Sequence, residues 1–261
     1  TARVDCARCD NRSASGAVPV QPAGGSKLLV LTPGMTHIPG TASGFSGSPA
    51  NQTAGVAFTA TVLAADAQYN LVADNPVLRT RGSDPNAGLP PDFGLSAGSG
   101  TVSMTLVTAS TATVSSVMTT QGAGGFNYAA STTPVFNINA AAASRLQVLM
   151  PGENAAAGSA NGKSGTVSAQ TAGLRFNATL RATDAFWNPV PSAGGNVAAA
   201  ASDPFAVMPA TQPLQSGSTV FAIPLVTAGA QTLTFNETAA AFSSTSAVVQ
   251  VNAGAFAKLQ L

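Results

Sequence analysis

The sequence repeats itself at an offset of 118 residues, and this repeat limits the possible folds more than any other feature. The stretch SKLLVLTPG at 26–34 matches SRLQVLMPG at 144–152, and QTAG occurs at 52–55 and again at 170–173. A pattern that occurs twice at a fixed offset indicates two copies of one structural unit joined in tandem.

Further matches extend the repeat over most of the chain. Residues 66–70 match 184–188, 83–85 match 202–204, 106–110 match 225–229, and 136–140 match 249–253. We therefore predict a first domain at 26–140 and a second domain at 141–253. An unrelated segment, 1–25, precedes them, and 254–261 follows them.

Apolar residues alternate with polar ones within each copy, which is the period of a β-strand. Positions that stay apolar in both copies are predicted to face a core; they include Phe58, Ala60 and Val62 in the first copy and Phe176, Ala178 and Leu180 in the second. In the opening strand, Leu29 corresponds to Gln147 and Gln260, so this side is expected to face solvent. One buried and one solvated face is typical of antiparallel sheets.

Units of about 110 residues with short alternating strands and Gly/Pro turns favour immunoglobulin-like sandwiches. The predicted fold class is all-β: two tandem immunoglobulin-like β-sandwich domains with an extended N-terminal segment and a C-terminal extra strand. The alanine-rich stretches Ala140–Ala143 and Ala198–Ala201 are short and lie between strand signals. We therefore expect linker or strand there and no helix.

The shared motifs L-x-V-L-x-P-G, Q-T-A-G-x-x-F, D-A-x-x-N-P-V, S-D-P and L-V-T-A-G, and the terminal VNAGAFAKLQL, resemble the tandem Ig-like repeats of large exported bacterial surface proteins. The resemblance covers about residues 26–261. The first copy departs from it, with Leu71 where the second has Pro189. Such repeats serve as stalks, adhesin shafts and envelope fibres, so the resemblance implies a bacterial, exported, non-enzymatic protein.

Charged residues are scarce, and their scarcity argues against several function classes. Lys and Arg number 11, Asp and Glu number 10, and the net charge is +1, which is not the signature of a nucleic-acid-binding protein. No run of 18 apolar residues occurs, so we predict no membrane span. His37 is the only histidine and the repeat does not retain it. We therefore expect no catalytic residue, no metal, no cofactor and no enzyme activity.

Two cysteines, Cys6 and Cys9, lie in the N-terminal segment. A c-type haem site would need histidine at the next position, where Asp10 stands. A disulfide, either local or between chains, is the favoured interpretation in an oxidising setting. Free thiols, and a metal site shared with another chain, remain alternatives.

The last five residues, 257–261, match the first strand of the repeat. Lys258, Leu259, Gln260 and Leu261 correspond to the start of a further unit. Either they belong to a longer protein, or they form an assembly strand that adds to a sheet of another copy. The second reading predicts a head-to-tail homopolymer, because contacts of this kind do not close into a ring.

Two more recurring features are candidate sites. Tyr69 and Trp187 occupy equivalent positions, where an aromatic ring can bind a sugar or a partner or can cover the end of a core. Asp66 and Asp184 also recur, each four residues before an asparagine. A single carboxylate per unit is too few for calcium, so a turn cap is favoured over a Ca²⁺ site.

Together these observations predict a non-enzymatic structural subunit of an extracellular filament, sheath or cell-surface stalk, assembled head to tail through β-strand addition. The alternative is an adhesin shaft or a glycan- or protein-binding module of a larger surface protein. The expected partners are copies of the chain itself and a glycan or cell-envelope component.

Overall fold

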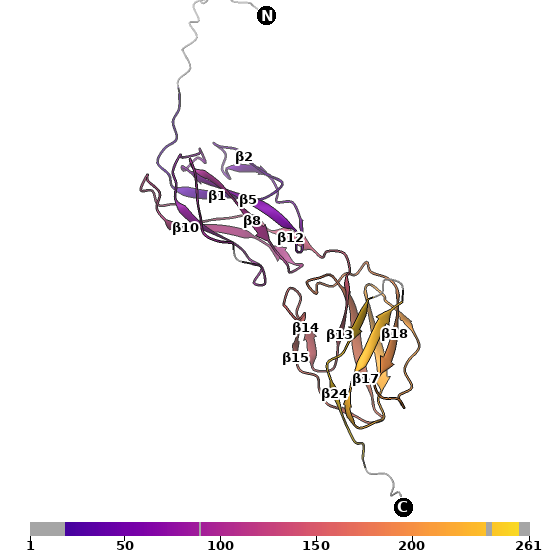
Figure 1. The fold of residues 1–261 in the computed structure, drawn as a ribbon. Helices are drawn as coiled ribbons and strands as arrows, with labels where there is room; N and C mark the ends of the chain where they lie inside the picture. The colour runs from indigo at the N-terminus through magenta and orange to yellow at the C-terminus, as the bar shows by residue number, and fades with distance from the viewer. Residues whose placement is uncertain (1–18, 89, 239–241, 256–261) are drawn as a thin grey trace, which may run out of the picture.

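The computed structural model describes residues 19–88, 90–238 and 242–255. These residues form strands, turns and loops and contain no helix, which confirms the predicted all-β class. Two sandwich units follow one another along the long axis of the molecule, and the described part of the chain begins at one extremity and ends at the other (Figure 1).

Each unit consists of short strands. In the first unit, these are β1 (Lys27–Leu31), β2 (Met35–His37), β3 (Phe45–Gly47), β4 (Gln52–Thr53), β5 (Ala57–Ala65), β6 (Val77–Gly82), β7 (Phe93–Gly94), β8 (Ser99–Thr105), β9 (Thr111–Ala112), β10 (Val114–Thr120), β11 (Ser131–Thr132) and β12 (Phe136–Asn139). In the second unit, they are β13 (Arg145–Leu149), β14 (Glu153–Ala155), β15 (Lys163–Gly165), β16 (Gln170–Thr171), β17 (Arg175–Thr183), β18 (Asn196–Ala201), β19 (Gln212–Pro213), β20 (Ser218–Pro224), β21 (Gly229–Gln231), β22 (Leu233–Glu237), β23 (Ser243–Thr245) and β24 (Val249–Asn252).

The sheets of the two units have the same strand order. The first unit has sheets β1-β5-β8, β11-β10-β6-β7 and β4-β12-β9, and the second has β13-β17-β20, β19-β18-β22-β23 and β16-β24-β21. Each unit also has a hairpin, β2-β3 or β14-β15. Most pairings are antiparallel, as the alternation predicts, but β4 with β12 and β16 with β24 are parallel. The repeat in sequence is therefore a repeat in topology.

Each unit has its own buried core between its sheets. One cluster of buried side chains is drawn from residues 28–138 and the other from residues 146–251. The predicted core-facing positions of β5 and β17 are buried, from Phe176 at 8% exposed to Leu180 at 0%. In the second core the rings of Phe221 and Phe235 lie 5.5 Å apart between centroids.

The expectation that Leu29 and Gln147 face solvent is wrong. Their side chains are only 4% and 3% exposed. In the first unit, Leu29, Leu31 and Leu63 form a small cluster with Met35 and Phe45 of the β2-β3 hairpin. The sheet is thus covered on both sides, because the hairpin folds back over its outer face. In the second unit, Gln147 donates its amide to the carbonyl oxygen of Gly162, beside hairpin β14-β15.

The alanine-rich stretches follow the expectation of linker or strand. Ala198–Ala201 lie in β18, and Ala140–Ala143 lie between β12 and β13. The N-terminal segment through residue 18, with Cys6 and Cys9, lies outside the described residues. So do Lys258, Leu259, Gln260 and Leu261 of the predicted assembly strand.

Candidate functional site: the junction between the two units

A tight turn at Asp184–Asn188 organises the end of the second unit that meets the first. The Asp184 carboxylate accepts hydrogen bonds from the backbone N–H groups of Phe186 (2.8 Å) and Asn188 (3.0 Å) and from the Asn188 side-chain amide (2.9 Å). It also accepts one from the N–H of Ala141 in the linker, at 3.0 Å. The carboxylate therefore caps its own turn and ties the linker to it.

The first unit builds the same turn at Asp66–Asn70. Its carboxylate accepts from the N–H groups of Gln68 and Asn70, from the Asn70 amide, and from the N–H of Ala23 in the preceding segment, all at 2.9–3.0 Å. Burial alone would raise the pKa of Asp66, but these hydrogen bonds outweigh it and lower the pKa below its usual range. The substitution of Leu71 for proline in this copy leaves the turn intact.

At the junction, Asn188 connects the two units through both ends of its side-chain amide. Its Nδ2 donates to the carbonyl oxygen of Val107 at 2.8 Å, and its Oδ1 accepts from the N–H of Ala109 at 2.7 Å. Asn188 is fully buried. Because both polar groups are matched, the contact fixes position and orientation together.

Apolar and backbone contacts surround this amide. Phe186 packs against the core of the first unit, and its ring occupies the space that a Cβ on Gly55 would need. Gly158, on the loop after β14, lies against the Thr108 side chain in the same way. Asn86 donates its amide to the carbonyl oxygen of Ala157 at 3.3 Å. Small residues at 55 and 158 therefore permit the close approach of the two units.

The receiving loop of the first unit is held in shape by Asp84, which is buried. Its carboxylate accepts from the N–H groups of Val107 (2.7 Å) and Thr108 (2.8 Å) and from the Thr108 hydroxyl (2.7 Å). Burial opposes ionisation of Asp84, but the hydrogen bonds, led by that from the Thr108 N–H, lower its pKa. The fixed loop presents the Val107 carbonyl and the Ala109 N–H to Asn188.

The two candidate aromatic residues lie in the turns, each with a positive φ, 62° at Tyr69 and 65° at Trp187. Both side chains are half-buried. Each ring rests against a glycine of the adjacent hairpin, Gly44 or Gly162. A cation lies over each ring, with Arg145 4.7 Å from the Trp187 ring and Lys27 4.1 Å from the Tyr69 ring. In this conformation the rings brace the turn against the hairpin.

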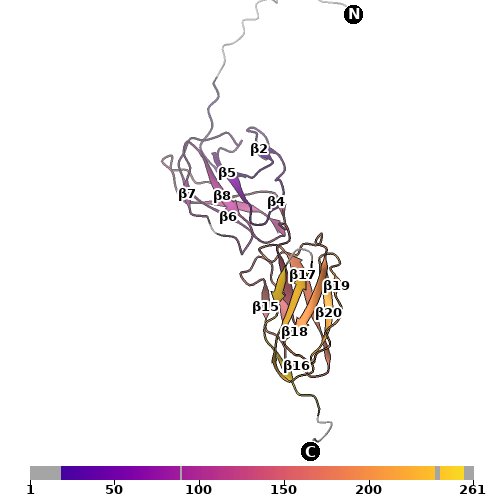
Figure 2. The same ribbon diagram turned by 45° about the vertical axis from the view of Figure 1, so that its right-hand side comes forward.

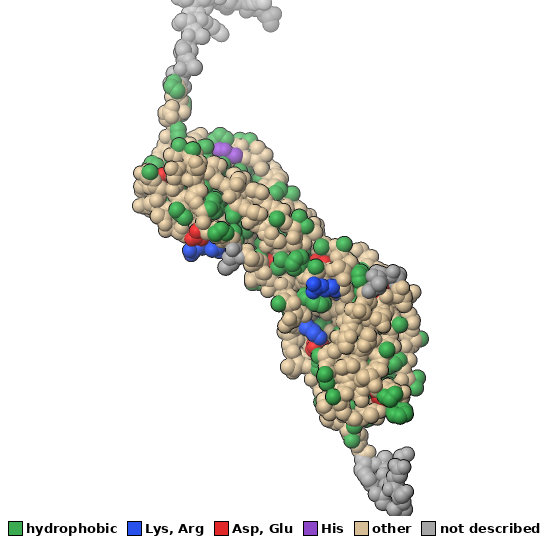
Figure 3. All heavy atoms as spheres, in the orientation of Figure 1, with side chains coloured by type: hydrophobic (Ala, Val, Ile, Leu, Met, Phe, Trp, Pro, Cys, Tyr) green, Lys and Arg blue, Asp and Glu red, His purple; other side chains and the backbone are tan. Residues whose placement is uncertain are grey.

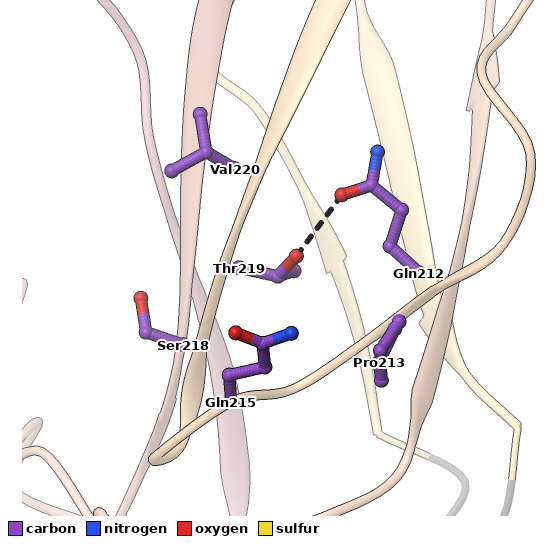
Figure 4. Close-up of a pocket in the computed structure, with 6 residues that line it drawn as sticks. All are labelled: Gln212, Pro213, Gln215, Ser218, Thr219 and Val220. Carbon is purple, nitrogen blue, oxygen red and sulfur yellow. Dashed lines mark hydrogen bonds between the residues drawn. The ribbon is translucent and has the colours of Figure 1, made fainter.

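Other surface features offer less chemistry. An open hollow of about 410 Å³ lies beside β19 and β20 and is lined by Gln212, Pro213, Gln215, Ser218, Thr219 and Val220 (Figure 4). These six side chains are amide, hydroxyl or apolar, and none ionises near pH 7. Among the described residues, no group of three or more His, Cys, Asp and Glu side chains could hold a metal ion. His37 Nε2 donates to the carbonyl oxygen of Tyr69 at 2.7 Å.

Sequence reasoning found the recurring Asp66 and Asp184 turns but missed the residues that join the units. Phe186, Asn188 and Asp84 were given no role in a junction. A signal was present, since the S-D-P and L-V-T-A motifs recur in both copies. Their recurrence marks the receiving loop, but only the structure brings that loop to the turn of the next unit.

Neither a protein-family model nor a curated protein matches the chain. Among solved structures, it is similar to the D0–D1 domains of intimin, with a TM-score of 0.29 and 11% identity over 77% of this chain and 93% of that one. Similarity to FdeC, an Escherichia coli adhesin, has a TM-score of 0.34 and 13% identity over 89% of this chain and 66% of that one. Similarity to invasin, a bacterial integrin-binding protein, has a TM-score of 0.28 and 18% identity over 87% of this chain and 40% of that one. At these low scores the similarities carry no functional argument.

No helix in the described part of the chain is long and apolar enough to span a membrane.

Proposed function

We propose that the chain is a non-enzymatic structural module of a bacterial extracellular filament, sheath or cell-surface stalk, in which Ig-like units are held end to end. The junction carries this proposal: a buried asparagine, an apolar ring and two close glycine contacts join one unit to the next. A linker alone would leave the units free to reorient. Contacts of this kind instead favour a stiff rod, the mechanical property that a stalk or filament needs.

The surface fits the same role. Charged side chains are sparse over the visible face of both units (Figure 3). Among the described residues, the ion pairs are Arg79–Asp92, Arg81–Asp92 and Lys163–Glu153. The junction itself uses amide, backbone and apolar contacts. Its stability should therefore change little with ionic strength, which suits a protein outside the cell.

The stiffness of the junction can be tested by small-angle X-ray scattering of the full chain. Phe186→Gln combined with Asn188→Ala should shorten the maximum dimension and broaden the distance distribution, because the ring and the amide that fix the second unit are removed. Glutamine is compatible with the turn, since Gln68 holds the equivalent place in the first unit. An unchanged scattering curve would contradict the proposed stiff rod.

Asn70→Ala is the matched control. It removes the same side-chain hydrogen bond to the capping aspartate within a turn, but this turn lies away from the junction. Extrapolated to zero concentration, where association between copies does not contribute, its scattering curve should superimpose on that of the wild type. Any change in the double variant can then be assigned to the junction and not to the turn.

The finer proposal is head-to-tail assembly by β-strand addition through residues 257–261. Residues 257–261 match the first strand of the repeat. In the first unit of another copy, the position of that strand beside β5 is already occupied by β1, which pairs with β5 from Lys27 to Leu31. A strand from another copy would therefore add to the other edge of that sheet, at β8. This edge is the feature that supports the proposal.

Deleting 257–261 should leave a folded chain that no longer forms filaments at concentrations where the wild type does, because the added strand would be lost. Electron microscopy would measure filament formation and circular dichroism would check the fold. Substituting Gln260→Lys, which keeps the strand length and Leu259 and Leu261, serves as the control. Filaments formed by the deleted chain at those same concentrations would rule out strand addition.

The alternative is an adhesin shaft or a glycan- or protein-binding module. The hollow lined by Gln212 and Gln215 is the feature that favours it, because amide side chains can bind hydroxyl groups of a sugar. Binding of the full chain to a glycan array that is lost with Gln212→Ala would support this alternative.

A further inference from the structure

The two surfaces that meet at the junction occur a second time, at the two outer ends of the pair. The first unit carries the inserting surface, the Asp66–Asn70 turn. The second unit carries the receiving surface, formed by Gly173, Phe205 and the loop Val226–Ala228, which correspond to Gly55, Asn86 and Val107–Ala109 of the first unit. Figure 2 places β16, which precedes Gly173, at the end of the second unit away from the first.

The receiving surface is open where its counterpart is filled. A Cβ on Gly173 would meet no atom within 4 Å, whereas one on Gly55 would overlap the Phe186 ring. Val226 is 44% exposed and Phe205 is 75% exposed. Within the described residues, neither the carbonyl of Val226 nor the N–H of Ala228 forms a hydrogen bond.

The loop of this receiving surface is held by the same hydrogen bonds as the loop of the first unit that binds Asn188. The Asp203 carboxylate accepts from the N–H groups of Val226 (2.7 Å) and Thr227 (2.9 Å) and from the Thr227 hydroxyl (2.7 Å). Asp84 makes the same three bonds in the first unit. The loop is therefore formed before anything binds it, which lowers the entropy cost of binding.

The inserting surface is open as well. Asn70 is bonded to Asp66 as Asn188 is to Asp184, but it is half-buried where Asn188 is fully buried. A Cβ on Gly40, the counterpart of Gly158, would meet nothing within 4 Å. The Asn70 side chain thus has one donor and one acceptor position available.

We propose that the receiving surface of the second unit binds the Asp66–Asn70 turn of a second copy of this chain. In this contact, Asn70 Nδ2 donates to the carbonyl of Val226, and Asn70 Oδ1 accepts from the N–H of Ala228. The inference rests on the proposed structural function and adds the two surfaces that form the contact. Because the two surfaces differ and lie at opposite ends, the contact does not close and produces a linear chain of copies.

The apolar side chain belongs to the inserting turn at the internal junction, but to the receiving surface in the contact between copies. At the internal junction, Phe186 of the inserting turn meets Gly55 and lies near Asn86. Between copies, the inserting turn carries Gln68, and the receiving surface carries Phe205 in place of Asn86. An exposed phenylalanine is then covered by the incoming turn, which supplies the hydrophobic part of the contact.

Sedimentation velocity of the full chain, in a concentration series up to about 1 mM, tests the proposal; this range suits the weak affinity of a small, untethered contact. The weight-average mass of the wild type should rise from 25.7 kDa to at least twice that value without reaching a plateau. Phe205→Glu and Gln68→Glu should each keep the chain monomeric, because each places a carboxylate in one half of the contact.

A mixture of the two variants gives the sharpest result. Each retains one intact surface, so the mixture should form a one-to-one complex and nothing larger. Val117→Glu, at a 41% exposed position in the middle of β10, is the control and should associate like the wild type. Circular dichroism of each variant checks the fold.

A wild type that stays monomeric, a Phe205→Glu variant that associates normally, or a mixture without the one-to-one complex would each overturn the inference. These outcomes leave the proposed function standing if the scattering experiment still finds a stiff junction. A flexible junction would instead contradict the proposed function itself.

Discussion

Phe221→Ala is expected to lower the free energy of unfolding of the second unit by about 3–5 kcal/mol. Phe221 is fully buried, and its ring packs against that of Phe235, so truncation removes apolar contacts and leaves a cavity in the core. The first unit has a separate core, and its unfolding transition should stay where it is.

Urea denaturation with two probes separates the units. Trp187 is the only tryptophan of the chain and lies in the second unit, so its fluorescence reports on that unit, while circular dichroism reports on both. Phe205→Ala is the matched control, since it makes the same substitution in the same unit at a 75% exposed position; it should change stability by less than about 0.5 kcal/mol. Equal effects of the two substitutions would contradict the assigned core.

Asp203→Asn should destabilise the second unit by about 3 kcal/mol at pH 7. The carboxylate accepts hydrogen bonds from two backbone N–H groups of the Val226–Thr227 loop, from the Thr227 hydroxyl and from the N–H of Phe205. An amide has only one oxygen for these donors and directs its own NH₂ group at others. Thr227→Val, which removes only the hydroxyl donor, should cost about 1 kcal/mol.

The same substitution predicts a pH dependence. Burial alone would raise the pKa of Asp203, but the hydrogen bonds from Thr227, Val226 and Phe205 outweigh it and lower the pKa from 3.8 to about 2. Ionised Asp203 therefore stabilises the folded state fully above about pH 5, and this contribution is lost as the pH falls towards 2. The stability difference between wild type and variant should accordingly shrink between pH 5 and pH 2. A difference that stays constant over this range would show that the charge of Asp203 is not responsible.

Much of the fold follows from comparing the two copies of the repeat. Positions such as Val62 and Leu180 stay apolar in both, and the structure buries them. The comparison fails at Leu29 and Gln147, because a polar residue in one copy does not by itself mean that the position is exposed. The hairpin that covers this face is a tertiary contact, and a glutamine can be buried where a carbonyl, here that of Gly162, accepts its amide.

The site could be predicted only in part for a similar reason. The turn cap at Asp184 is local in sequence, so the spacing of Asp and Asn four residues apart predicts it. The contact of Asn188 with Val107 joins residues 81 positions apart. Asn70 has the same sequence context as Asn188 but lies at an outer end, so a motif identifies the turn and cannot say what it meets.

Electron microscopy of the native material, with the intact mass of the denatured chain measured beside it, tests the structural role most directly. The proposed function predicts regular thin filaments in which the long axis of each two-unit pair follows the filament axis. Native material that consists only of isolated two-unit particles would contradict it.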